Sequence, residues 1–357
     1  MSDAPLFTAL ATSSRQLYSL LRCIAFNPQA VVSITPDGLR FTTEEVHAVQ
    51  ASTLLDKLLF SSYLLSDQDA TIPPFRINII ALLETLQIFG ISDSASSHKA
   101  PSGGITSSYA AAFHTPALGL GGTCKITYSR FGAPLCITIE ENGVKTTCDM
   151  NTYNLPNMYD ADENEIPLDR NALVMKIIMP AFSLHDAISE LASTSSETLV
   201  VSASSIHAPY FALEGHGGPF GDSTVDFAPA STMDGLSTAR RVQPAATETF
   251  SIAAPSGSGG RVKERYKFDL IKKAGRAMAL ASKVSFRMDR QGVLSLQFMV
   301  EQPEVTANAT TAYGGPGGFS FIDYRFVPLV GEDNDDDHGD DEDETYQQDE
   351  EDEAIAE

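Results

Sequence analysis

The chain has 357 residues, 43% of them hydrophobic, and a formal net charge of −23 at pH 7. This length and apolar content suffice for two domains of ordinary size. No stretch approaches the roughly 18 apolar residues that a membrane-spanning helix requires, so we expect no membrane partner.

Much of the negative charge belongs to the end of the chain. Residues 331–357 contain 16 Asp and Glu and no Lys or Arg, which leaves 31 acids against 24 bases, or −7, in residues 1–330. Such a segment cannot bury enough apolar surface to fold, so the sequence predicts a disordered acidic tail at 331–357. Its Asp-Glu-Asp-Glu run at 341–344 also occurs in some nucleases, but catalytic carboxylates must be held by a rigid scaffold. We interpret the tail as a solvating or partner-binding segment.

The chain begins with a predicted strand, helix and hairpin. After a strand candidate at 6–11, four apolar residues have the spacing of one buried helix face: Leu17, Leu20, Leu21 and Ile24. Arg15 and Arg22 fall on the opposite face. Strands are predicted at 31–35 and 39–41, because a Thr-Pro-Asp-Gly turn separates them.

Further strands and one helix complete the first half. Strands are predicted at 47–55 and 60–65, and a helix is predicted at 76–89 from its buried stripe of Ile79, Leu82, Leu83 and Leu86. An Asn-Gly turn then indicates a hairpin between 137–140 and 144–147. Strands therefore dominate, and the helices are few and short.

The same order of elements returns in the second half. The pattern of the first helix recurs at an offset of 167 residues, at Leu184, Ile188 and Leu191. A helix-like run at 266–280 follows the run at 76–89 at an offset of 190, whereas the strands after these two runs are offset by 158. The difference of 32 matches a Ser-, Gly- and Ala-rich stretch at 92–122, which we interpret as a surface insert.

Domain boundaries follow from this repeat and from composition. We predict a first domain at 1–150 and a second domain at 172–330. The connector between them, 151–171, holds prolines and acids without a periodic pattern. Two stretches rich in Gly, Pro, Ser and Thr, at 214–261 and 303–318, are predicted surface inserts of the second domain.

Cysteines and histidines give no sign of a catalytic or metal site. The four cysteines form no CxxC pair, and the seven histidines show no ligand spacing such as HExxH. The amino terminus lacks the features of a secretory signal, so we expect buried thiols in a reducing compartment. The sequence predicts no cofactor, no metal site and no catalytic residue.

One basic cluster points to a nucleic-acid partner. Lys272, Lys273 and Arg276 lie at helical spacing, on the side opposite the apolar residues of the same run. With Arg15 and Arg22 of the first helix they would make two positive helix faces in an otherwise acidic protein, as expected of a DNA-facing surface. An ordinary solvated helix face is the alternative interpretation.

Five separated motifs, in the same order along the chain, carry a family resemblance. They read VSITPDGLRF, FRINI, RYK, KVSFR and GVLSLQF, and they lie at 32–41, 75–79, 265–267, 283–287 and 292–298. Together they resemble the Rad-one subunit family of the nine-one-one checkpoint clamp. The match covers most of residues 5–330, and it departs from the family at the predicted inserts and the tail.

This resemblance implies an α+β fold of two repeated sliding-clamp domains, with strands outside and four short helices lining the inner face of a ring. It implies a non-catalytic, nuclear subunit of a heterotrimer with two other clamp subunits. A clamp loader would place the ring around double-stranded DNA at damage sites, where it would scaffold checkpoint and repair proteins. Because a closed ring is held topologically, an acidic protein can serve if its inner helix faces are positive.

Two other functions stay open. Members of this family have been credited with 3′–5′ DNA exonuclease activity, although no rigidly placed acidic pair for catalytic metal ions is evident outside the connector and the tail. A homotrimeric replication processivity clamp is the second alternative. It differs from the first interpretation in whether the chain closes a ring with itself.

Overall fold

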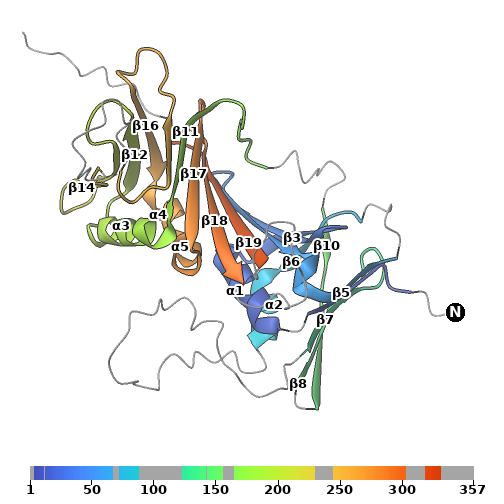
Figure 1. Cartoon of the computed structure of the whole chain (residues 1–357). Coiled ribbons are helices and arrows are strands. Elements are labelled where there is room, and N and C mark those ends of the chain that lie inside the picture. Colours follow the sequence, from blue (N-terminus) through green and yellow to red (C-terminus); the bar gives the residue numbers. More distant parts are fainter. Residues whose placement is uncertain are drawn as a thin grey trace, which may run out of the picture.

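The computed structural model of the chain describes residues 4–11, 13–66, 72–87, 123–141, 143–155, 165–229, 244–302 and 318–330. Strands dominate these ranges, and the helices are short. Figure 1 shows two halves, each with strands and a pair of helical segments.

The first half runs from β1 to β10. Its strands alternate buried and less buried residues, as β1 does with Phe7, Ala9 and Ala11 in the core, because one face of each strand covers the interior. A short 3₁₀ turn, Lys57–Leu59, links β4 to β5. The elements are β1 (Phe7–Ala11), α1 (Ser14–Ile24), β2 (Gln29–Thr35), β3 (Gly38–Glu45), β4 (Val49–Asp56), β5 (Phe60–Leu65), β6 (Phe75–Asn78), α2 (Ile79–Gln87), β7 (Thr123–Tyr128), β8 (Leu135–Glu141), β9 (Val144–Met150) and β10 (Tyr153–Asn154).

The second half runs from β11 to β19. Its elements are β11 (Leu173–Pro180), α3 (Ala181–Ser193), β12 (Thr198–Ser204), β13 (Phe211–His216), β14 (Ser223–Asp226), β15 (Thr249–Ile252), β16 (Arg261–Lys267), α4 (Phe268–Lys272), α5 (Gly275–Leu280), β17 (Lys283–Asp289), β18 (Leu294–Gln302) and β19 (Gly318–Phe326). Each element from β11 to β19 has a counterpart in the first half, with α4 and α5 together in the place of α2.

The two halves share one topology, which confirms the predicted repeat. In the first half the strand orders are β5-β1-β7-β8-β9 and β6-β2-β3-β4. In the second half they are β15-β11-β17-β18-β19 and β16-β12-β13-β14. Adding ten to each strand number of the first half gives the second half, so the chain contains one fold twice.

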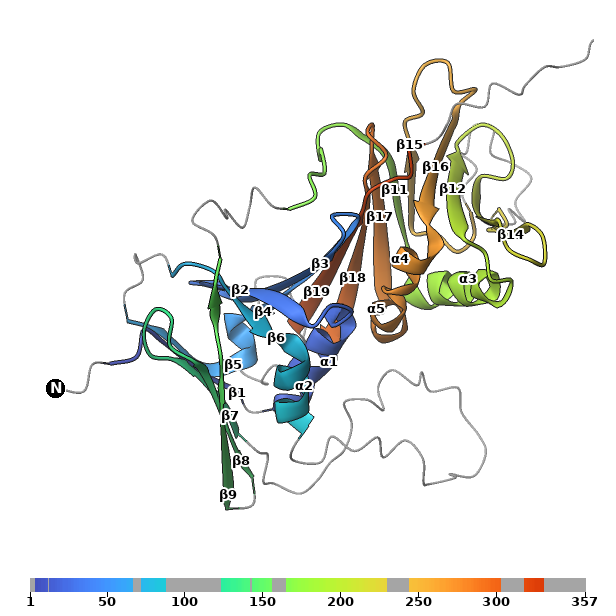
Figure 2. The same cartoon turned by 180° about the vertical axis from the view of Figure 1, so that it is seen from behind.

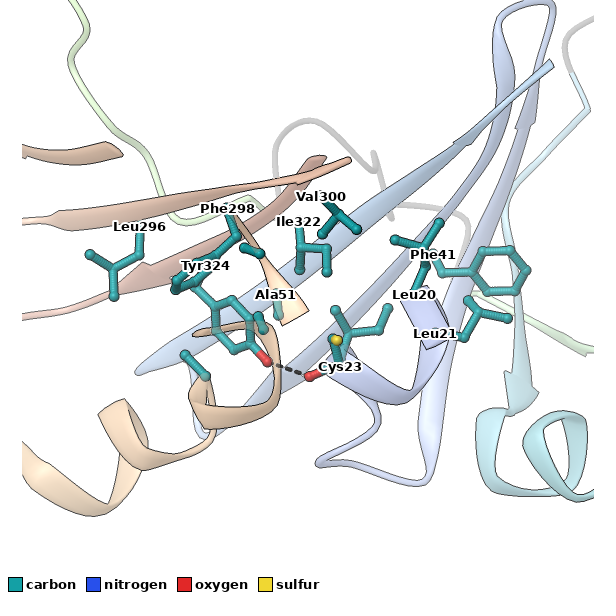
Figure 3. Close-up of a cluster of buried hydrophobic side chains, with 14 of the residues drawn as sticks. Leu20, Leu21, Cys23, Phe41, Ala51, Leu296, Phe298, Val300, Ile322 and Tyr324 are labelled. Carbon is teal, nitrogen blue, oxygen red and sulfur yellow. Dashed lines mark hydrogen bonds between the residues drawn. The ribbon is translucent and has the colours of Figure 1, made fainter. Parts of the chain in front are cut away.

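Strands β4 and β19 join the halves at what we call the internal junction. They pair antiparallel over five residue pairs, beginning with Val49 opposite Phe326. Ten strands thereby form one sheet, in the order β10-β6-β2-β3-β4-β19-β18-β17-β11-β15. Buried apolar side chains of both halves, among them Phe41, Phe298 and Tyr324, form one continuous core across this junction (Figure 3).

All helices lie along one side of the molecule. Seen from opposite sides in Figures 1 and 2, they follow one another in the order α3, α4–α5, α1 and α2, with the strands on the other side. Helix α1 packs against α2, α3 packs against α5, and α1 meets α5 at the internal junction. The predicted arrangement of strands on one side and four helical segments on the other is confirmed.

Two helices begin later than the sequence predicted. Residues 76–78 belong to β6 and residues 266–267 belong to β16, so α2 begins at Ile79 and α4 at Phe268. A strand that runs directly into a helix places apolar residues at spacings that fit either structure, and this explains the error.

The fourth helical segment is interrupted between α4 and α5. The amides of Lys273 and Ala274 donate to carbonyls three residues earlier, the pattern of a tight 3₁₀ turn. The Lys273 carbonyl lies 3.1 Å from the hydroxyl of Tyr324, a partner outside the helix. Gly275, which favours helix weakly, then begins α5.

The predicted insert at 214–261 was wrong in part. It overlaps the end of β13 and contains β14 and β15, which are short strands at the edges of their sheets. Edge strands can be polar on both faces, so they lack the alternating pattern by which strands are recognised in sequence. Predictions for 92–122, 230–243, 303–317 and the tail at 331–357 lie outside the described residues.

The end of the connector is fixed across the internal junction. The Glu165 carboxylate lies 3.1 Å from Nη1 of Arg40 in β3 and 2.9 Å from Nη2 of Arg325 in β19. The amide of the buried Ile166 donates to the Gln50 side chain at 3.1 Å, and its carbonyl accepts from Arg325.

Within the described ranges, no helix is long and apolar enough to cross a membrane.

Candidate nucleic-acid interface

Helix α1 presents two arginines away from its core. Its apolar residues recur at the spacing of one face, and the buried ones are Leu17, Tyr18, Leu20, Leu21, Cys23 and Ile24. Arg22 is exposed in the last turn, with its guanidinium 5.8 Å from the centre of the Tyr18 ring. Arg15 is half-buried in the first turn. Because α1 contains no acid, its outer face is positive.

Helices α4 and α5 add two exposed bases. Lys272 lies with its Nζ 2.6 Å from Asp269 and 5.6 Å from the centre of the Phe268 ring. The hydrogen bond from Lys272 lowers the pKa of Asp269, so this carboxylate stays charged and offsets part of the lysine charge. Arg276 is exposed on α5, whereas the opposite face of α4, which includes Ile271, is buried.

The structure brings one predicted base of the fourth helical segment, Arg276, to the end of the first helix. Nη1 of Arg276 donates to the Arg22 carbonyl at 3.3 Å. This carbonyl is among the last of α1, which lack partners within the helix, and the helix dipole favours a cation there. Arg15 and Lys272 lie on the same two helical segments, α1 and α4, and we call the four residues Arg15, Arg22, Lys272 and Arg276 the basic patch.

Lys273, the fifth predicted residue, has a different setting. Its Nζ lies 2.7 Å from Glu45 of β3 and 5.4 Å from the centre of the Phe26 ring, and its side chain is only 23% exposed. Its charge is therefore balanced inside the internal junction. We assign Lys273 to the junction and not to the basic patch.

Tyr324 lies at the centre of this junction. Its hydroxyl donates to the Cys23 carbonyl at the end of α1 (dashed line in Figure 3) and lies near the Lys273 carbonyl. Its ring contacts Phe26, Phe298 and Phe326, with centroids 6.1, 6.0 and 5.9 Å away. Burial raises the pKa of Tyr324 well above its ordinary value, so the hydroxyl keeps its proton and stays a donor.

Five side chains hold the two halves together, and we call them the clasp: Phe26, Glu45, Lys273, Arg276 and Tyr324. Sequence reasoning missed all of these contacts, because each joins residues more than 200 positions apart. Of the five clasp residues, only Arg276 and Lys273 could be singled out in the sequence, because they are charged residues on a predicted helix. The clasp fixes how the basic patch is presented.

Helices α2 and α3, away from the junction, carry acids and no Lys or Arg. Glu84 is exposed on α2, and Asp186 and Glu190 are exposed on α3. Phe182, at the start of α3, is 48% exposed. Positive charge on the helix side of the molecule is therefore concentrated in the middle, beside the internal junction.

No metal-binding arrangement occurs in the part of the chain that the structure describes, where His, Cys, Asp and Glu form no group of three or more able to hold an ion. All four cysteines are free thiols. Burial raises the pKa of both Cys23 and Cys124 to about 12, which makes these two thiols poor nucleophiles. The half-buried pair, Cys136 and Cys148, lies on β8 and β9.

Comparison with known proteins gives relatives along almost the whole chain. The DNA damage checkpoint control protein rad1 of Schizosaccharomyces pombe is 28% identical over 340 residues, which cover 92% of this chain and 89% of that protein. The cell cycle checkpoint protein RAD1 of Homo sapiens is 29% identical over 314 residues, 88% of each chain. The DNA damage checkpoint control protein RAD17 of Saccharomyces cerevisiae is 23% identical over 310 residues, 85% of this chain and 68% of that one.

A family model supplies the assignment. The model described as repair protein Rad1/Rec1/Rad17 matches residues 6–300, which include the first half of the repeat with the internal junction strand β4 and the second half up to β18. The chain therefore belongs to the Rad1/Rec1/Rad17 family of repair proteins.

Proposed function

We propose that this chain is a non-catalytic subunit of a heterotrimeric ring clamp that encircles double-stranded DNA at damage sites. The checkpoint names of the relatives from fission yeast and human support the role in the DNA damage checkpoint. The repeated fold, with strands on one side and helices on the other, supports the ring. In such a ring the helices face the DNA.

The internal junction is the observation that carries the proposal. In the repeat, β9 is the counterpart of β19 and β14 is the counterpart of β4. Among the described strands, β9 and β14 each lie at the edge of a sheet and have a partner on one side only. An edge strand offers a row of unpaired amides and carbonyls to another chain.

Ring closure follows from repeating the β4–β19 contact between subunits. The β9 edge of this chain would pair with the β14-like edge of one neighbour, and its β14 edge with the β9-like edge of the other neighbour. Such head-to-tail contacts generate a closed ring when the rotation between subunits closes. This arrangement requires two partner subunits, one for each edge.

The basic patch supplies the contact with DNA. Arg22, Lys272 and Arg276 are exposed on the helix side and can reach phosphates, which bind cations without regard to base sequence. Residues 1–330 carry −7 even with these bases counted, so the protein outside the patch repels DNA. Weak contacts with topological enclosure let the ring slide along the duplex and still stay on it.

The wider setting follows from this mechanism. A closed ring needs a clamp loader to open it around DNA, and the outer strands leave a broad surface for checkpoint and repair proteins. Such a complex works in the nucleus. Nothing in this mechanism requires a metal ion, a cofactor or a nucleophile on this chain.

Topological retention is the test. The chain, its two partner subunits and a clamp loader are incubated with nicked circular DNA, and then the circle is cut. We expect the ring to resist a wash at high salt on the circle and to leave once the DNA is linear, because only enclosure survives screening of charges. Equal loss from circular and linear DNA would contradict the ring.

The same samples test the two alternative functions. The exonuclease would be supported if the purified chain released nucleotides from a 3′-labelled strand and if a substitution in this chain abolished that release. A mass of three copies for the chain alone would support the homotrimeric processivity clamp.

A further inference from the structure

The open edge formed by α2 and β9 can be compared residue by residue with the internal junction. Phe7 of β1 pairs with the last residue of β5 and with Tyr128, and Met175 of β11 pairs with the last residue of β15 and with Met288. The structure therefore aligns Tyr128 with Met288, an offset of 160 residues in place of the 158 expected from the sequence. Following the strand registers outward from these two residues places Cys148 of β9 where β19 has Tyr324. The junction thus has a fully buried aromatic ring where this edge has a small, half-buried thiol.

The helices can be matched in the same way. Helices α2 and α4 each begin directly after a strand, and the amide of the first residue donates at 2.9 Å to the carbonyl of the residue before β2 or β12. Counting from these equivalent starts, Glu84 takes the place of Lys273, and Gln87 takes the place of Arg276. The edge therefore has an acid where the clasp has its lysine.

The other open edge, formed by α3 and β14, is also unlike its counterpart. Helix α3 repeats α1 at an offset of 167, so Ser193 takes the place of Phe26. The turn after β13 takes the place of the turn after β3, and it carries Asp222, whose carboxylate lies 2.8 Å from the His216 ring. Glu190 adds an exposed acid near the end of α3.

Closing a ring from copies of this chain would therefore recreate none of the clasp. The ring–ring contact of Phe26 and Tyr324 would become a contact of serine and cysteine. The ion pair of Lys273 with Glu45 would be replaced by Glu84 facing the acidic turn after β13. Like charges placed together across an interface cost free energy, and the small side chains would leave space unfilled.

We propose that the α2–β9 edge selects a different clamp subunit over a second copy of this chain, an inference that rests on the proposed ring function. The partner it fits carries a Lys or Arg where this chain has Glu45, so that the base pairs with Glu84. It also carries a large apolar side chain where this chain has Phe26, which fills the space over Cys148. Charge and volume at this edge together set the order of subunits in the ring.

A variant with the clasp chemistry restored tests the selection. Glu84→Lys with Cys148→Tyr is made in the full chain, and association is measured with itself and with each partner subunit by mass photometry and surface binding. We expect at least tenfold weaker binding of the partner at the α2–β9 edge, equivalent to about 1.4 kcal/mol. Affinity at the α3–β14 edge should not change, and self-association should strengthen at least tenfold because the introduced lysine would then face Asp222.

Two further variants test whether the effect is specific to the charge at this edge. Glu301→Lys makes the same charge change at an exposed position of β18, inside the ten-stranded sheet and away from both edges, and it should leave every affinity unchanged. Glu84→Gln removes only the exposed charge, and it should weaken the same partner about threefold. An unchanged α3–β14 affinity in each variant shows that the protein is folded.

Specific outcomes overturn the selection and leave the ring function intact. Rings that still form on DNA, with the variant binding its α2–β9 partner as tightly as the original chain does, would show that Glu84 and Cys148 do not select. A stable homotrimer of the unmodified chain would contradict both the selection and the proposed heterotrimer. Failure of the unmodified chain to bind any clamp subunit would instead contradict the ring function itself.

Discussion

The helices beside the internal junction and those at the outer ends hold equivalent places in the repeat, yet they carry opposite charge. Helices α1, α4 and α5 expose Arg22, Lys272 and Arg276, whereas α2 and α3 expose Glu84 and Asp186. Their buried faces are mainly apolar, because each helix fills the same space against its sheets. The fold thus constrains one face of each helix and leaves the other free to acquire its own role, which we propose is contact with DNA in the middle and contact with neighbours at the ends.

Removing the centre of the junction should have the largest effect. Tyr324→Ala deletes a buried ring and a buried hydrogen bond, so we expect the free energy of unfolding to fall by ~3–5 kcal/mol. Chemical denaturation measures the change. Tyr153→Ala, the same truncation at a side chain that is 59% exposed, should change stability by less than about 0.5 kcal/mol. Similar losses in both variants would contradict the central role of Tyr324.

Reversing the three exposed bases of the basic patch should have the next largest effect, this time on DNA. In the assembled ring, Arg22, Lys272 and Arg276 changed to Glu should reduce the slope of log affinity against log salt by about 2.7, roughly 0.9 for each phosphate contact. Between 50 and 200 mM salt this difference amounts to about fortyfold in affinity. Binding to short duplexes at several salt concentrations gives the slope. An unchanged slope would return these residues to the role of an ordinary solvated helix face.

The ion pair between the halves should contribute less. Lys273→Met and Glu45→Gln, alone and combined, form a double-mutant cycle, and we expect a coupling energy of about 0.5–1 kcal/mol for this partly exposed pair. Lys273→Met alone should leave the salt slope of DNA binding unchanged, because the charge of Lys273 is already balanced by Glu45. A slope reduced by about 0.9 in Lys273→Met alone would place this lysine on the DNA instead.

Changing the outer helices should have the smallest effect. Asp186→Lys adds a positive charge to α3, far from the junction, and it should raise the affinity of the assembled ring for DNA less than threefold if DNA stays near the middle of the chain. Ser189→Ala, on the same exposed side of α3, serves as the control without a charge change. A gain as large as the loss from the patch reversal would show that DNA contacts all helices equally.

Much of the fold could be predicted because it repeats and because its helices are amphipathic. The stripe of Leu17, Leu21 and Ile24 returns as Leu184, Ile188 and Leu191, and both stripes form buried helix faces. Boundaries were harder to predict where a strand passes directly into a helix, at Asn78 and Lys267. The short strands β14 and β15 were missed because pairing with a neighbour, and not an apolar pattern, holds them in place.

The candidate site was predictable only in its charges. Arg15, Arg22, Lys272 and Arg276 stand out on helix faces in the sequence. The partner of Lys273 could not be predicted, since Glu45 lies 228 positions away along the chain. Whether a base belongs to the basic patch or to the internal junction depends on such distant contacts, which only the folded chain defines.

The unbroken core also determines how the chain can move. Apolar residues from β1 to β19 belong to one cluster, so neither half can unfold and leave the other with its full set of contacts. The amides of β4 and β19 should consequently exchange with solvent as slowly as those of the central strands, in a single cooperative unit. A ring built from such stiff arcs opens where separate chains meet. A loader would therefore pull neighbouring subunits apart and leave this subunit unbent.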